Sequence, residues 1–146
     1  MKELSMILNE DNKVILPEAL MPEQLKMGPL ETQIAMIAIS QIPFENKIDA
    51  DECVYVVSVP NLAAFLKMDC QTLKAGLQQA CEALLRAVTV HEANGNHRTF
   101  PLISFICIKN EKIYIQLSEP FKTYLKKPGD EKAEFELKGL LNGCRI

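Results

Sequence analysis

The sequence predicts an α+β domain in which a helix-turn-helix is followed by a β-hairpin, the arrangement called a winged helix. Three observations support this fold class. Residues 54–59 (VYVVSV) are rich in β-branched side chains, which favour a strand. Two helical patterns follow, separated by a break at Met68-Asp69. After Arg86 the apolar side chains recur at every second position, and Asn94-Gly95 is a strong hairpin-turn signal.

A helix before this unit is expected to begin near Pro29 and to end before Pro43. Glu31 is favoured in its first turn, at the positive end of the helix dipole. Apolar side chains such as Ile34 and Met36 lie on more than one face of this helix. Such a helix is either central to the core or covered by a partner.

The helix-turn-helix carries its own start signals. Pro60 suits the first turn of the first helix, and Asp69 is expected to be the N-cap of the second. The apolar spacing predicts inward side chains at Leu62, Phe65 and Leu66 of the first helix. In the second helix it predicts one buried face made of Leu73, Leu77, Ala80, Cys81, Leu84 and Leu85.

The wing is expected to continue into a long return strand over residues 98–110, with a bulge or an edge position at Pro101. A tight turn at Asn110-Glu111 leads to an alternating strand, and Ser118 is expected to cap a short helix after it. The expected organisation is an N-terminal arm over residues 1–27, the winged helix over residues 28–127, and a C-terminal tail or the start of an interdomain helix over residues 128–146.

Length and charge limit the classes of function. A chain of 146 residues is expected to form one domain, and its net charge of −3 argues against non-specific attraction to polyanions. The first residues do not resemble a signal peptide, and the longest apolar run, residues 34–39, is too short to span a bilayer. The expected location is therefore the cytoplasm, with no membrane partner.

No pattern of reactive side chains indicates an enzyme. His91 and His97 flank the Asn94-Gly95 turn, without the Ser or Cys order of a nucleophilic triad. There is no phosphate-binding glycine loop, and the five cysteines lack the close pairs of a zinc site. We therefore expect no catalytic residues, no metal site and no cofactor. The cysteines are interpreted as reduced, buried small hydrophobes.

The order of these elements resembles plasmid replication initiator proteins of the iteron-binding type. The resemblance covers about residues 30–125 and depends on four segments: LETQIAMIAISQI, YVVSVPNLAAFL, LKAGLQQACEALLRAVTV and FPLISFICIKNEKIYIQLSEPFKTYL. It implies the N-terminal winged helix of an initiator that has two. In that family the second winged helix is the main reader of the repeated iteron sites, and this chain ends where it would begin.

The resemblance implies that plasmid origin DNA, with its iterons, is a partner. The outward face of the second helix is rich in glutamine, which can pair with adenine edges, while lysine and arginine can bind phosphates. The alternative is an ordinary solvated helix face. We expect the cations to cluster near the helix-turn-helix and the wing. The candidate DNA-binding residues are Lys67, Gln71, Lys74, Gln78, His97 and Arg98.

The resemblance also implies a homodimer that forms through this domain and dissociates for initiation. The apolar strand supplies the candidate dimer residues Phe105, Ile106, Cys107 and Ile108, although burial within the monomer would explain them equally well. The expected function is plasmid replication initiation, through dimerisation and auxiliary contacts to DNA phosphates. Host replication proteins are further candidate partners. The alternative is a winged-helix protein-interaction module that does not bind DNA.

Overall fold

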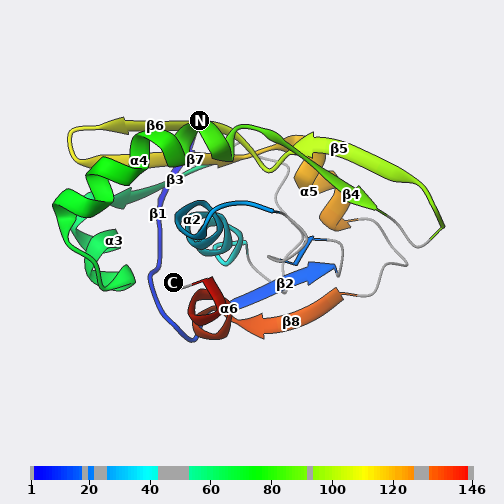
Figure 1. Ribbon diagram of the computed structural model, residues 1–146, viewed down its shortest axis with the longest axis horizontal. Coiled ribbons are helices and arrows are strands. Elements are labelled where there is room, and N and C mark those ends of the chain that lie inside the picture. The colour runs from blue at the N-terminus through cyan, green and yellow to red at the C-terminus, as the bar shows by residue number, and fades with distance from the viewer. Residues whose placement is uncertain are drawn as a thin grey trace.

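The computed structural model describes residues 2–17, 20–21, 26–42, 53–91, 94–126 and 132–144. It contains a four-stranded sheet, two smaller two-stranded sheets and five helices within these residues (Figure 1). In chain order the elements are β1 (Lys2–Ser5), β2 (Lys13–Pro17), α2 (Pro29–Ile39), β3 (Cys53–Ser58), α3 (Val59–Leu66), α4 (Cys70–Leu84), β4 (Ala87–His91), β5 (His97–Pro101), β6 (Ile103–Lys109), β7 (Lys112–Leu117), α5 (Glu119–Lys126), β8 (Lys132–Glu136) and α6 (Leu137–Cys144).

The largest sheet has the strand order β1-β3-β7-β6. β1 runs parallel to β3, and the other neighbouring strands are antiparallel. Tyr55 lies opposite Ile115 and Val57 opposite Ile113, and all four side chains are buried. Because side chains alternate along a strand, this pairing gives the sheet one face that packs on the core.

Local capping groups define the helix-turn-helix as the sequence predicts. The Ser58 hydroxyl accepts a hydrogen bond from the Asn61 amide at the start of α3 (3.2 Å). Lys67 ends α3 in the left-handed conformation, with φ of 58°. The Asp69 carboxylate then accepts a hydrogen bond from the Thr72 amide (3.4 Å), which confirms Asp69 as the N-cap of α4.

The buried faces of the two helices follow the expected spacing with three exceptions. Phe65 packs against the core but is only partly buried. Cys81 is only half-buried. Leu85 is 43% exposed, so its predicted place in the core is wrong. The reason is that α4 ends at Leu84 and Leu85 is already its C-cap. The side chains that are buried are Leu62 and Leu66 of α3, and Leu73, Leu77, Ala80 and Leu84 of α4.

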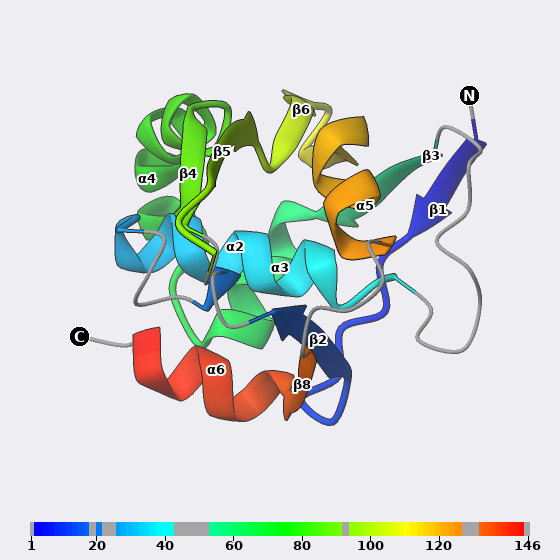
Figure 2. The ribbon, with the colours of Figure 1, turned by 90° about the vertical axis from the view of Figure 1, so that its right-hand side faces the viewer.

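α2 is the central helix, which confirms one of the two predicted situations. Every side chain from Thr32 to Ile39 is buried. α4 packs against one side of α2 and α6 against another, and Figure 2 shows α2 between them. The helix begins at Pro29, as predicted, and ends at Ile39. The expected terminator, Pro43, lies outside the described residues.

The predicted long return strand is wrong in one respect, because it is divided between two sheets. β5 pairs with β4 in the hairpin, whereas β6 pairs with β7 in the large sheet. The break falls at Leu102, whose carbonyl accepts a hydrogen bond from the Ser118 amide (2.9 Å). Pro101 precedes it and has no amide hydrogen to donate to a ladder, so the pairing changes there.

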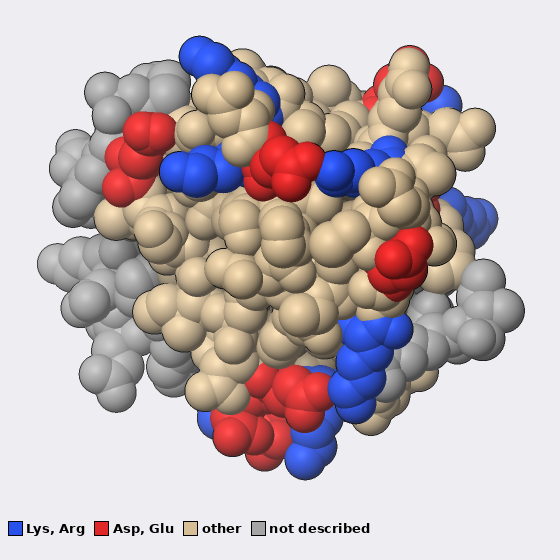
Figure 3. Space-filling model, turned by 90° about the vertical axis from the view of Figure 1, so that its left-hand side faces the viewer, with Lys and Arg blue, Asp and Glu red and all other residues tan. Residues whose placement is uncertain are grey.

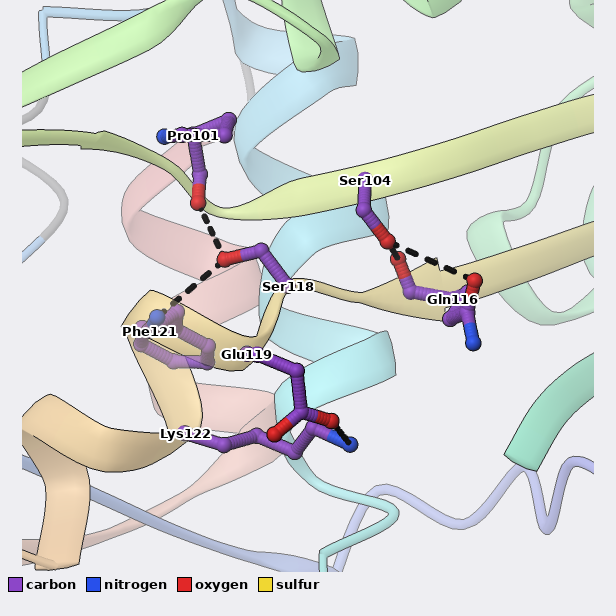
Figure 4. Close-up of polar contacts among 7 residues, drawn as sticks. All are labelled: Pro101, Ser104, Gln116, Ser118, Glu119, Phe121 and Lys122. Carbon is purple, nitrogen blue, oxygen red and sulfur yellow. Dashed lines mark hydrogen bonds and ion pairs between the residues drawn. The ribbon is translucent and has the colours of Figure 1, made fainter. Parts of the chain in front are cut away.

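Ser118 joins this break to the start of α5 (Figure 4). Its hydroxyl donates a hydrogen bond to the Pro101 carbonyl and accepts one from the Phe121 amide (3.1 Å). Ser118 is therefore the cap of α5, as predicted. One turn along, the buried Lys122 ammonium binds the Glu119 carboxylate at 3.0 Å.

Both terminal segments contribute to the folded core. β2 lies within the expected N-terminal arm and pairs antiparallel with β8, which lies within the expected C-terminal tail. Val14 and Leu16 of β2 are fully buried, and Leu137 and Leu141 of α6 are nearly so. Within the described ranges, no helix is both long and apolar enough to cross a membrane.

Candidate nucleic-acid interface

The outward face of α4 carries the predicted polar side chains. Gln71, Lys74 and Gln78 are exposed, because the opposite face of the helix holds the leucines of the core. Hydrogen-bonding groups along an exposed helix can contact DNA bases or phosphates. The structure therefore makes these three residues available to a ligand.

Lys74 already has a partner. Its ammonium forms an ion pair with the carboxylate of Glu111, in the turn between β6 and β7. The hydrogen bond to Glu111, together with the negative charge of this carboxylate, raises the pKa of Lys74 above its ordinary value of 10.5. Lys74 therefore stays charged at neutral pH, but a DNA phosphate would have to compete with Glu111 for it.

The hairpin presents its two predicted residues on opposite faces. His97 lies opposite His91, and Arg98 lies opposite Val90. Because neighbouring residues of a strand point to opposite faces, His97 faces solvent while Arg98 is on the side of the core. The Arg98 guanidinium lies 6.0 Å from the centroid of the Tyr124 ring, within the range of a cation–π contact.

The expected cluster of cations at the helix-turn-helix and the wing is wrong. Figure 1 places the α3–α4 turn at one end of the molecule and the tip of the β4–β5 hairpin at the other. Lys67 and Lys74 therefore lie far from His97 and Arg98. The reason is that α4 has 15 residues, which at about 1.5 Å per residue extend about 20 Å before β4 begins.

The surface at the helix-turn-helix end has mixed charge. Figure 3 shows basic and acidic side chains side by side in small groups, separated by a wide area without charged side chains. A protein that binds DNA by itself usually has a continuous basic face. The described residues on this face therefore do not form such a basic face.

β6 forms an edge of the large sheet in the part of the chain that the structure describes. Phe105 is 43% and Ile108 45% exposed, while Ile106 and Cys107 are half-buried. Burial within the monomer therefore accounts for only part of this apolar strand. An exposed apolar edge strand can pair with another strand.

The outer face of the large sheet has a shallow depression of about 350 Å³ beside β6. Phe105 and Cys107 line it together with residues that the sequence reasoning missed, and Tyr114 and Val54 are the main apolar ones. The sequence could have identified Tyr114, because this residue alternates with the buried Ile113 and Ile115 and must point to the other face of the sheet.

The fold agrees with the comparison to known families. Residues 13–142 match the model of the family described as Initiator Replication protein, WH1. The chain belongs to this family. Its elements form the WH1 winged helix, as the sequence predicts, and a search of curated proteins finds no match.

Two solved structures resemble this WH1 chain. The first is the Pi initiator protein in complex with iteron DNA, with a TM-score of 0.69 and 13% identity, covering 91% of this chain and 58% of that one. The second is the WH1 domain of MSBI1.176, a replication protein isolated from a multiple sclerosis patient, with a TM-score of 0.50 and 18% identity, covering 90% and 94%. The WH1 chain therefore spans little more than half the length of Pi.

The cysteines and histidines of the described residues are also candidates for a metal site or a nucleophile. Among the residues described, no group of three or more histidine, cysteine or acidic side chains could hold a metal ion. Cys81 is half-buried, and its burial, together with the proximity of Cys107, raises the pKa of its thiol. A thiol with a raised pKa is a weaker nucleophile at neutral pH.

Proposed function

We propose that this WH1 domain acts in the initiation of plasmid replication by pairing with a second copy through β6 and by contacting the phosphates of origin DNA. Base-specific recognition of iterons is assigned to a second winged helix. Family membership over residues 13–142 is the observation that carries the proposal. The iteron DNA in the Pi structure supports the choice of ligand.

The auxiliary nature of the DNA contact follows from the charge of α4. Its exposed face offers glutamines and Lys74, and Lys74 is already bound to Glu111. Phosphate contacts position a protein on DNA but do not specify its sequence. An acidic protein with so few basic groups on this helix is better suited to position DNA than to read it.

The separation of the two candidate surfaces constrains how DNA could lie. Lys67, Gln71, Lys74 and Gln78 belong to the helix-turn-helix end, and His97 and Arg98 belong to the hairpin at the other end (Figure 1). One duplex could reach both surfaces only by running along the long axis of the molecule. We therefore propose two separate phosphate contacts instead of one basic cluster.

The proposed dimer uses the edge of the large sheet. Pairing of β6 with β6 of a second copy would satisfy the outer backbone groups of this strand. On the outer face of the sheet it would cover Phe105, Cys107 and the depression beside them. On the other face it would cover Ile106 and Ile108. We propose these four residues of β6 as the centre of the interface, and host replication proteins as further partners outside it.

Gel shifts at low salt test the DNA contact. An iteron duplex and a scrambled duplex of equal length are compared with wild-type protein, with the single variants Lys67→Glu and Lys74→Glu, and with the double variant. Equal and salt-sensitive binding to both duplexes, weakened in the variants, is expected. Lys138→Glu, a single charge change at an exposed position of α6, is the control for each single variant and should leave binding nearly unchanged.

Analytical ultracentrifugation tests the dimer. Phe105→Asp should convert a dimer into monomers, while Thr123→Asp, on an exposed position of α5, should not. A wild-type protein that is monomeric at high concentration and also ignores DNA would overturn both parts of the proposal.

A protein-interaction module that does not bind DNA is the second candidate. The net charge of −3 and the neutralised Lys74 favour it. In the full-length protein, Lys74→Glu combined with Arg98→Glu distinguishes the two functions. Unchanged nucleic-acid binding supports the interaction module, and a clear loss excludes it.

A further inference from the structure

The two histidines of the chain face each other on the hairpin. His91 on β4 lies directly opposite His97 on β5, and Thr89 lies opposite Thr99 on the same face. The other face of the hairpin holds Val90, which is buried. Both imidazoles are therefore on the exposed face, where a ligand in solution can reach them.

The distance between the two rings suits a shared metal ion. Their centroids are 5.9 Å apart and the ring planes are inclined by 47°. Two imidazole nitrogens at about 2.0–2.1 Å from one tetrahedral ion would place the ring centroids roughly 5 Å apart. Small rotations of these exposed side chains, which occur within nanoseconds, close the difference.

The hairpin holds the pair in place before any ion arrives. The Thr89 and Thr99 hydroxyls are hydrogen-bonded at 2.9 Å, one step along the ladder from the histidines. At the turn, the Asn96 amide donates to the Asn94 side chain (2.9 Å), and Gly95 takes the positive φ of 91° that the turn requires. The backbone of the pair is therefore already fixed, and only the two side chains have to be ordered on binding.

We propose that His91 and His97 form a two-imidazole binding site for a late first-row divalent cation, Cu²⁺, Ni²⁺ or Zn²⁺. Neutral imidazole nitrogen is a preferred ligand of these ions, whereas Mg²⁺ and Ca²⁺ prefer oxygen ligands. With two protein ligands, water or an external ligand fills the remaining positions. The site shares His97 with the proposed phosphate contact of the hairpin, and it adds positive charge to the hairpin when the ion is bound.

The affinity order follows from the ligand set. Cu²⁺ is expected to bind most tightly, with Ni²⁺ and Zn²⁺ weaker, as for most nitrogen sites. The bound ion joins β4 to β5, and it should therefore raise the melting temperature of the protein.

Nickel titration of the untagged full chain tests the proposal. Because the chain has only two histidines, the protein labelled at histidine gives two sets of imidazole resonances by NMR. Both sets are expected to respond together to NiCl₂. His91→Ala and His97→Ala are each expected to weaken binding at least tenfold in calorimetry, while Thr123→Ala, on an exposed position of α5, keeps the whole hairpin and should bind within about twofold of wild type.

Three results would overturn the site. One is nickel affinity that is unchanged in both histidine variants, with their fold verified by circular dichroism. Another is a response of only one imidazole. The third is binding that disappears on alkylation of the cysteines but persists in the histidine variants, which would assign the ion to the thiols.

Discussion

The helix-turn-helix and the hairpin are both candidate DNA contacts, but they hold their cations differently. Lys74 binds the Glu111 carboxylate, which cancels its charge, whereas Arg98 lies over the neutral ring of Tyr124. A cation–π contact positions a guanidinium on the face of an aromatic ring. A lysine on the expected recognition helix is therefore not necessarily available to a DNA phosphate.

The two regions also differ in what anchors them, and the largest expected effect tests this. Phe100 is 6% exposed, and its ring centroid lies 5.6 Å from that of Tyr124 and 6.5 Å from that of Phe121. Phe100→Ala should lower the free energy of unfolding by about 3–5 kcal/mol, because it leaves a cavity beneath the hairpin. Urea denaturation measures this loss, and Thr99→Ala on the exposed face is the control.

The helix-turn-helix depends more on its caps. Asp69→Ala removes the acceptor for the Thr72 amide and should cost about 1 kcal/mol of stability. Asp69→Asn keeps a good N-cap and should stay close to wild type. Equal losses in both variants, measured by thermal denaturation, would show that the charge of Asp69 matters and its capping oxygen does not.

Removing the ion-pair partner of Lys74 should make its ammonium available to DNA phosphates. Glu111→Gln removes the carboxylate that competes with phosphate, so DNA affinity at low salt should rise roughly two- to fivefold. Glu82→Gln removes the same charge from the exposed face of α4 without touching this ion pair. If the DNA affinity of both variants rises equally in gel shifts, the net charge explains the effect, and the ion pair with Glu111 does not limit phosphate binding by Lys74.

The smallest expected effect concerns pH. Glu111 raises the pKa of Lys74, so the ion pair contributes its full stability below 10.5 and loses it only as the pH rises through the higher pKa of the folded state. The stability difference between wild type and Glu111→Gln should therefore be the same at pH 7 and pH 9. A difference that changes within this interval in urea titrations would contradict the assignment.

Features that depend on neighbouring residues could be predicted from the sequence. Pro60, Asp69, Ser118 and the turn at Asn94-Gly95 each act on a backbone within a few positions, and the structure confirms all four. The family could be predicted as well, because it depends on the order of many such elements.

Features that depend on distant parts of the chain could not be predicted from the sequence. The pairing of β1 with β3 and of β2 with β8 joins segments far apart in sequence, and short strands give no signal of their partners. The break at Leu102 depends on a hydrogen bond from Ser118. The predicted cation cluster failed because residue spacing does not reveal where the far end of a helix directs the next strand.

The break at Leu102 also couples two surfaces mechanically. One residue separates β5, in the proposed DNA-contacting hairpin, from β6, in the proposed dimer edge. Ser118 donates hydrogen bonds from its hydroxyl to the Pro101 carbonyl and from its amide to the Leu102 carbonyl, so this single residue holds the connection between β5 and β6. When a ligand tilts the hairpin, the tilt either strains the hydrogen bonds of Ser118 or shifts β6 through the continuous backbone.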